Sequence, residues 1–241
     1  MNDRLQNHLH YLGLTRIRAQ YDELERLAVR KKLSPAAFFE ELIADEVAAR
    51  QERSVQRRIK NAHFPVIKTL EDFRWSAPLA IDRDLVQYLF TLKFLDGHRN
   101  ICFLGGNGIG KTHLLIALGY QACQKGYNVR FESAVKIINT LKGAQLTGNF
   151  LRAMKTYTAP ELLCIDELGF LPIDQDGGNL LFQVISERYE TGSIAITSNL
   201  AYTDWPKVFN KDAAMVSAML DRLLHHCDTV LLEGPSFRTE R

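Results

Sequence analysis

A glycine-rich stretch near the middle of the chain, FLGGNGIGKTHLL, has the residue types and spacing that bind phosphate groups. Gly105 is followed after four residues by Gly110, Lys111 and Thr112, which is the P-loop spacing. Glycines let backbone N–H groups turn toward phosphate oxygens at a helix N-terminus, where the helix dipole also favours anions. We expect Lys111 to reach the β- and γ-phosphates and the Thr112 hydroxyl to coordinate Mg²⁺. The alternative is a chance glycine-rich turn, which the apolar ICFL before the loop and the helical THLLIALGYQACQ after it argue against.

Two carboxylates follow an apolar run in the segment LLCIDEL. Asp166 ends an expected buried strand, so its carboxylate can hold Mg²⁺ through water. Glu167 can polarise an attacking water, which favours hydrolysis over transfer to a small substrate; a surface acid that caps the next turn is the alternative. The predicted nucleotide site comprises Gly105, Gly106, Asn107, Gly108, Ile109, Gly110, Lys111, Thr112, His113 and Asp166, with Thr112 and Asp166 as the Mg²⁺ ligands.

Three more polar residues lie near the ends of expected strands. Asn199 ends SIAITSN, beside the expected P-loop strand, where its amide can bond a γ-phosphate and a water, although turns favour asparagine in any case. Arg222 precedes the last expected strand and Arg238 follows it. An arginine delivered to a γ-phosphate, often by a neighbouring subunit, accelerates its transfer strongly. A structural ion pair explains either arginine equally well.

Short apolar runs alternate with helical segments in the larger part of the chain. The five expected strands are residues 101–104, 128–132, 162–166, 193–197 and 229–232. This alternation predicts a mostly parallel sheet covered by helices, with ligands at the carboxyl ends of the strands.

The N-terminal part of the sequence is helical. Ser34 is suited to cap a helix that starts at Pro35 and runs for roughly 25 residues. Its expected apolar face consists of Phe38, Leu42, Val47 and Ala48. With shorter amphipathic segments before it, this helix predicts a small domain over residues 1–62, and Pro65 marks the boundary with a nucleotide-binding α/β domain over 63–241.

Composition limits the class of protein to which the chain can belong. The 241 residues are 46% hydrophobic, enough for one sizeable α/β core and a small appendage. No apolar run approaches the roughly 20 residues that span a bilayer, and no signal peptide is recognisable, so we expect a cytoplasmic protein without a membrane partner. The four scattered cysteines favour reduced, buried thiols. Adjacent His225, His226 and Cys227 are conceivable metal ligands, but packing at a helix end is the favoured interpretation.

The net charge is only +2, but its distribution is uneven. Between residues 50 and 68 a single acid, Glu52, stands among six basic residues, namely Arg50, Arg53, Arg57, Arg58, Lys60 and Lys68. A contact with a polyanion and a solvated helix face explain this run equally well.

The ordered set of segments resembles one family. The loop GGNGIGKTHLLIALGYQAC, then LLCIDELGFLP, LFQVISERYETGSIAITSNL, LDRLLHHCD and GPSFR, with FPVIKTLEDF upstream, are similar to the IstB family of AAA+ ATPases, which assist insertion-sequence transposases. That family is similar in turn to the helicase loader DnaC and the initiator DnaA. The resemblance implies an α/β AAA+ P-loop core with a five-stranded parallel sheet, a small helical N-terminal domain and no C-terminal lid domain.

The resemblance also implies roles for individual residues. The residues that act on nucleotide within the chain are Lys111 and Thr112 (Walker A), Asp166 and Glu167 (Walker B) and Asn199 (sensor 1). Arg222 matches the arginine finger that acts in trans on a neighbouring subunit. Arg238 is a further γ-phosphate or interface contact, and Arg188 is a rival interface arginine.

The partners follow from the same resemblance. It implies an ATPase that forms an ATP-dependent oligomer on double-stranded DNA, helps to select and deform that DNA, and activates or recruits its cognate transposase. A DnaC-like helicase loader is the near alternative; a small-molecule kinase is a different class, which Glu167, Asn199 and Arg222 disfavour. Because the insertion between the second and third strands lines the DNA path in such ATPases, the candidate DNA contacts are Lys142, Arg152 and Lys155 there, with Lys136, and Arg57, Arg58 and Lys60 in the N-terminal run.

Overall fold

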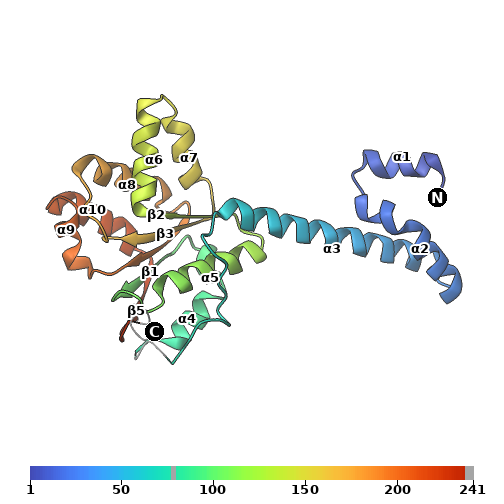
Figure 1. The fold of residues 1–241 in the computed structure, drawn as a ribbon, viewed down its shortest axis with the longest axis horizontal. Helices are drawn as coiled ribbons and strands as arrows, with labels where there is room; N and C mark the ends of the chain where they lie inside the picture. Colours follow the sequence, from blue (N-terminus) through green and yellow to red (C-terminus); the bar gives the residue numbers. More distant parts are fainter. Residues whose placement is uncertain (77–79, 237–241) are drawn as a thin grey trace. The chain divides into compact units, whose positions relative to one another are not determined.

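Three helices form the N-terminal part of the chain in the computed structural model, which describes residues 1–76 and 80–236 (Figure 1). They are α1 (Asp3–Tyr11), α2 (Thr15–Lys31) and α3 (Pro35–Ala62). The chain divides into two compact units, Met1–Arg57 and Arg58–Arg241. Ser34 begins α3 as expected, since its hydroxyl accepts a hydrogen bond from the Ala37 N–H at 3.2 Å. Helix α3 continues past the division between these units and ends at Ala62, so the expected domain boundary after residue 62 stays a prediction.

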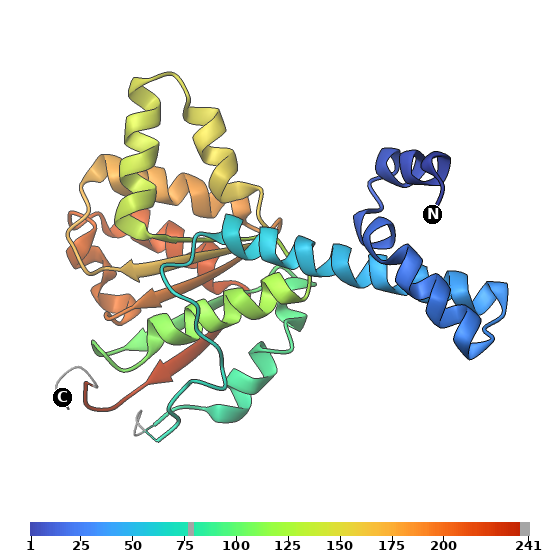
Figure 2. The same cartoon turned by 45° about the vertical axis from the view of Figure 1, so that its right-hand side comes forward.

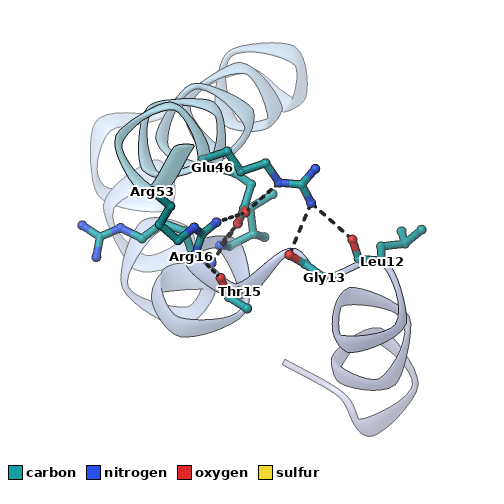
Figure 3. Close-up of polar contacts among 8 residues, drawn as sticks. Leu12, Gly13, Thr15, Arg16, Glu46 and Arg53 are labelled. Carbon is teal, nitrogen blue, oxygen red and sulfur yellow. Dashed lines mark hydrogen bonds and ion pairs between the residues drawn. The ribbon is translucent and has the colours of Figure 1, made fainter. Parts of the chain in front are cut away.

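One buried carboxylate, that of Glu46 on α3, organises the N-terminal unit (Figure 3). Helix α2 begins after Leu14 without a side-chain cap, so its first N–H groups need acceptors from elsewhere. Glu46 Oε2 accepts hydrogen bonds from the N–H groups of Arg16 at 2.7 Å and Ile17 at 3.2 Å. Its Oε1 accepts from Arg50 Nε at 3.2 Å and Arg53 Nη2 at 3.1 Å. Glu46 therefore supplies the missing cap of α2 from another helix.

The prediction of the apolar face of α3 is partly wrong. Leu42 is buried and Phe38 packs beside it, as expected, but Val47 is 45% exposed and Ala48 is also exposed. The inward position one turn after Leu42 belongs to Glu46, because the backbone of α2 requires an acceptor there. A pattern of apolar residues alone does not detect this polar position.

Five parallel strands form the sheet of the larger unit in the order β2-β3-β4-β1-β5. The strands are β1 (Asn100–Gly105), β2 (Val129–Ser133), β3 (Leu162–Leu168), β4 (Ser193–Ser198) and β5 (Cys227–Leu232). All five expected strands and their parallel arrangement are confirmed. The carboxyl ends of β3, β4 and β1 are consequently neighbours at one edge of the sheet.

Helices cover both faces of this sheet (Figures 1 and 2). They are α4 (Arg83–Leu89), α5 (Lys111–Gln124), α6 (Ala134–Leu146), α7 (Phe150–Thr158), α8 (Gln175–Arg188), α9 (Trp205–Val208) and α10 (Ala213–Leu224), with 3-10 turns at Lys93–Leu95 and Tyr202–Asp204. Each face of the sheet has its own hydrophobic core, and alternate residues of β1 pack into one or the other. Ile101 and Phe103 pack with α4 and α5, whereas Cys102 and Leu104 pack with the helices of the other face. Helices α6 and α7 form a hairpin that projects from the sheet (Figure 2).

The cysteines are free thiols, as the sequence predicts. Cys102, Cys123 and Cys164 are buried, and Cys227 is half-buried with its Sγ 3.6 Å from that of Cys102. In the described parts of the chain, every helix is too short or too polar to cross a membrane.

Candidate nucleotide site

The glycine-rich loop joins the end of β1 to the start of α5, as its spacing predicts. Gly105 has a φ of 146°, and a Cβ added there would lie 2.1 Å from the Leu232 carbonyl oxygen of β5. Gly110 has a φ of 103°, and a Cβ there would lie 2.7 Å from the Phe73 ring. Neither position therefore accepts a side chain. Helix α5 begins at Lys111, which directs the positive end of its dipole to the loop.

The Lys111 ammonium lies over the loop that precedes it. Only 9% of the residue is exposed, and Nζ donates hydrogen bonds to the carbonyls of Gly105 at 2.8 Å and Gly106 at 2.5 Å. The charge is thus held within the same turn whose N–H groups are suited to bind phosphate.

A carboxylate from β3 meets hydroxyls from two other elements. Asp166 is 7% exposed, and its Oδ1 accepts from Thr112 Oγ1 at 2.9 Å and from Thr197 Oγ1 at 2.5 Å. Thr112 lies in the first turn of α5, and Thr197 is the penultimate residue of β4. The structure therefore brings together the two residues expected to hold Mg²⁺. Carboxylate and hydroxyl oxygens suit that ion, so these residues fit it.

An irregularity in β3 exposes the second carboxylate. The pairing of β3 with β4 shifts by one residue between Ile165 and Leu168, which is a β-bulge. Glu167 lies in this bulge with a φ of 59°, and its side chain is exposed. Its N–H donates to Thr197 Oγ1 at 2.9 Å. Left-handed backbone at a non-glycine residue costs about 1–3 kcal/mol and concentrates at functional sites. The single hydroxyl of Thr197 thus accepts a hydrogen bond from the bulge and donates one to Asp166.

Two further expected nucleotide contacts border the loop. Asn199 directly follows β4, which pairs with β1, so it lies at the same sheet edge as the loop, and it is half-buried. The His113 ring nitrogen Nε2 lies 2.8 Å from the Thr69 carbonyl oxygen, and the ring packs edge-on against Phe73 with centroids 5.4 Å apart. His113 therefore connects α5 to the segment before α4; its expected contact with nucleotide stays a prediction.

Arg222 lies away from the loop of its own chain. It occupies the last turn of α10, where Nη1 donates to the Ala218 carbonyl at 2.9 Å and the guanidinium lies 4.9 Å from the Phe182 ring centroid. The next residue, Leu223, accepts a hydrogen bond from Asn100, the first residue of β1, whereas the P-loop follows the last residue of that strand. The length of β1, roughly 17 Å, thus separates Arg222 from the loop.

The rival arginine, Arg188, does not fit an interface role. It is 1% exposed, and its guanidinium donates to the carbonyls of Tyr157, Thr158, Pro160, Glu161 and Ser193 at 2.7–3.2 Å. Burial lowers its pKa to about 10. Arg188 therefore connects segments of its own chain, because the carbonyls that precede β3 need a donor. Arg238 lies outside the described residues.

The basic residues fall into different environments. Lys142 Nζ forms an ion pair with Asp174, with its two contacts at 2.5 and 2.7 Å, whereas the side chains of Arg152 and Lys155 are exposed on α7. Lys136 forms an ion pair with Glu132 at 3.0 Å. In the N-terminal run, Arg57 and Lys60 are exposed and Arg58 is half-buried.

Part of the N-terminal basic run has a structural role. Arg50 and Arg53 bind Glu46, and Arg53 Nη1 also donates to Thr15 Oγ1 at 2.7 Å (Figure 3).

Two residues of the site were not predicted from the sequence. Thr197 carries the hydroxyl that holds Asp166, whereas the prediction named Asn199, two positions later. The feature that could have indicated Thr197 is its position near the end of a strand next to the P-loop strand, where it pairs with Phe103 of β1. Phe73, 6% exposed, closes over Gly110; its segment offered no local pattern that indicated this contact.

Comparisons with known proteins identify the family of this chain. The family of IstB-like ATP-binding proteins matches residues 7–241. A protein of Geobacillus stearothermophilus, named as an ATP-binding protein of insertion sequence IS5376, is 36% identical over 99% of this chain and 94% of its own length. A corresponding protein of insertion sequence IS21 from Pseudomonas aeruginosa is 35% identical over 95% of this chain and 86% of its own.

Solved structures share the fold of the larger unit. The DnaC helicase loader superposes with a TM-score of 0.57 at 20% identity, over 73% of this chain and 99% of that one. DnaA from Aquifex aeolicus superposes with a TM-score of 0.56 at 24% identity, over 68% of this chain and 49% of that one. These likenesses identify the fold as AAA+. Because the family match extends over nearly all of its residues, the chain belongs to the IstB-like ATP-binding proteins of insertion sequences.

Proposed function

We propose that this protein hydrolyses ATP with Mg²⁺, assembles with copies of itself on double-stranded DNA, and prepares that DNA for a cognate transposase. The observation that carries hydrolysis is the shared carboxylate Asp166 beside the bulge that exposes Glu167. When bound, Mg²⁺ would neutralise charge on the β- and γ-phosphates. Thr112 and Asp166 would hold the ion, Lys111 would bind phosphate oxygens, and Glu167 would accept the proton of the attacking water.

Self-assembly is supported by the location of Arg222. An arginine at the opposite edge of the sheet from the P-loop does not reach the γ-phosphate of its own chain. Arg222 reaches the γ-phosphate of a neighbouring subunit if its edge of the sheet packs against the P-loop edge of that neighbour. An arginine supplied in trans raises the rate by about 10³–10⁵. We therefore assign Arg222 the trans role.

DNA contact is supported by the exposed charges of Arg152 and Lys155 on the projecting α6–α7 hairpin (Figure 2). Lys142 contributes less than the sequence suggests, since Asp174 already neutralises it. Arg57, Arg58 and Lys60 would contact flanking DNA or the transposase. Such contacts fall mainly on phosphates, because assembly along a duplex needs little reading of bases.

A transposase is favoured over a replicative helicase as the partner. Relatives that are 35–36% identical over most of their length are named for insertion sequences. The similarity to the helicase loader, at 20% identity, shows the fold alone.

Paired substitutions test the nucleotide chemistry. Glu167→Gln keeps the shape of the side chain but removes the base, so it should retain ATP affinity, abolish most hydrolysis and trap the assembled state on DNA. Lys111→Ala should weaken ATP binding itself. Glu187→Gln, an exposed acid on α8, is the matched control and should leave all readouts unchanged. Equal loss of ATP affinity in the Glu167 and Lys111 variants would contradict these roles, as would a monomer in sedimentation with ATP and DNA together.

A salt titration tests the DNA surface. Arg152→Ala with Lys155→Ala should weaken duplex binding on all sequences and flatten the slope of log K against log salt by roughly two units per protomer. The control removes two other exposed lysines, Lys93→Ala with Lys125→Ala, and should leave the slope unchanged. An unaltered slope in the Arg152 and Lys155 variant would exclude the hairpin from the DNA path.

A further inference from the structure

Three side chains of metal-binding type meet at the edge of the sheet opposite the P-loop. Glu190 lies in the connection between α8 and β4, and His225 and His226 lie between α10 and β5. One ligand atom of each, a carboxylate oxygen or a ring nitrogen, lies within 4.8 Å of the others. The Asn100 N–H donates to the His226 carbonyl at 2.7 Å, which fixes this group beside the first residue of β1. We propose that Glu190, His225 and His226 bind a divalent transition-metal ion, with Zn²⁺ as the representative.

The ligand set matches the chemistry of zinc. Two imidazoles and one carboxylate bind Zn²⁺ at about 2.0–2.2 Å in known sites, with a fourth position left for water or another donor. Tetrahedral ligands at that distance lie about 3.4 Å apart, so small rotations of these side chains complete the site. All three side chains are exposed, which permits both the rotations and access of the ion.

A neighbouring phenol orients one of the histidines. Tyr189 Oη lies 3.0 Å from His225 Nδ1, and the two rings pack with centroids 5.9 Å apart. In the metal-binding tautomer, Nδ1–H donates to the phenol oxygen and Nε2 presents its lone pair to the ion. Metal-bound histidines commonly have such a partner on the other nitrogen. Cys227 is not a ligand, since its Sγ lies beside that of Cys102.

A bound ion would connect two chain segments that the sequence separates widely. It would tie the turn after α8 to the end of α10, the helix that carries Arg222. Binding to the folded state alone stabilises it by mass action, so Zn²⁺ should raise the melting temperature.

The test uses full-length protein without a histidine tag, stripped with a chelator and free of nucleotide. Calorimetric titration with Zn²⁺ should give one equivalent per chain, and Co²⁺ should produce a visible absorption band. His226→Ala and Glu190→Gln should each weaken binding at least tenfold and remove the thermal shift. Tyr189→Phe should weaken it by about 10–100-fold through loss of the orienting hydrogen bond.

Matched controls lie outside the cluster. His98→Ala and Glu187→Gln alter exposed residues of the same kinds and should bind Zn²⁺ as the unaltered chain does. No binding below millimolar Zn²⁺ would overturn the proposal. So would binding that survives unchanged in both His226→Ala and Glu190→Gln. Because Glu190 is exposed, its amide variant should fold normally, and an unchanged circular dichroism spectrum verifies this.

Discussion

Replacement of Glu46 by glutamine should destabilise the N-terminal unit by about 2 kcal/mol. The carboxylate accepts two backbone N–H groups on one oxygen and two guanidinium groups on the other. An amide has one oxygen and one NH₂, so whichever way it turns, a donor faces donors on one side. The size of the effect depends on which bonds are lost.

Each side of the carboxylate contributes a different amount. Arg50 and Arg53 have side chains that are 53% exposed, so solvent screens their ion pairs to at most about 1 kcal/mol each. The N–H groups of Arg16 and Ile17 are less accessible, and a buried donor that loses a charged acceptor costs about 1–3 kcal/mol. The amide retains one pair of bonds, which leaves a net loss of about 2 kcal/mol.

Hydrogen–deuterium exchange of the full-length protein measures this loss locally. A change of about 2 kcal/mol accelerates exchange roughly 30-fold, and peptides from Asp3–Lys31 should show it. Glu41→Gln, an exposed acid on the same helix, is the control and should stay within 0.5 kcal/mol of the unaltered chain. Exchange within twofold of the unaltered protein in Glu46→Gln would refute the capping role of this carboxylate.

The same contacts make the difference in stability between the unaltered chain and Glu46→Gln depend on pH. Burial raises the pKa of Glu46, but the N–H groups of Ile17 and Arg16 and the two guanidinium groups bring it below its ordinary value of 4.5. A lowered folded-state pKa contributes stability above the unfolded-state pKa, and this is lost as the pH falls through the folded-state value. The advantage of the unaltered chain over Glu46→Gln should therefore shrink below about pH 4.5.

Three further predictions follow from individual contacts. Thr197→Val keeps the shape but removes the hydroxyl between Asp166 and Glu167, so steady-state ATP hydrolysis should fall at least tenfold while ATP affinity, measured by titration, falls less. Arg188→Lys has three donors for five carbonyls and should lower the urea midpoint by an amount equivalent to about 3 kcal/mol; a shift below 1 kcal/mol would contradict the structural role. Burial raises the pKa of Cys123 to about 12 and that of Cys164 as well, so both thiols should react slowly with disulfide reagents at pH 8 until urea exposes them.

The sheet was predictable because its strands are short apolar runs bounded by clear interruptions. In β1, four buried apolar residues precede a glycine pair, and buried apolar runs that end at polar residues recur in β3 and β4. The strand order was not predicted beyond the pairing of β4 with β1, since order depends on how crossover helices pack. The face of α3 was misassigned at Val47 because a buried glutamate is identified only by its partners on α2.

The site was predictable where local spacing encodes it. The contact between Thr112 and Asp166 follows from a loop after one strand and an acid at the tip of another. The contribution of Thr197 depends on a bulge that shifts the register by one residue. No spacing in the sequence indicates this bulge. The family resemblance made Arg188 a candidate interface arginine, yet five carbonyls of its own chain surround it. Glu190 and His225 are brought together only by the fold.

The carbonyls that surround Arg188 also determine where the chain tolerates changes of length. Four of them lie within residues 157–161, at the base of the α6–α7 hairpin, and the fifth begins β4. An insertion or deletion there would pull several acceptors away from one rigid guanidinium at once. The turn over residues 147–149, at the other end of the hairpin, is exposed, so extra residues there disturb no buried group. Homologous hairpins should therefore differ in length at their tips and keep a constant spacing at their bases.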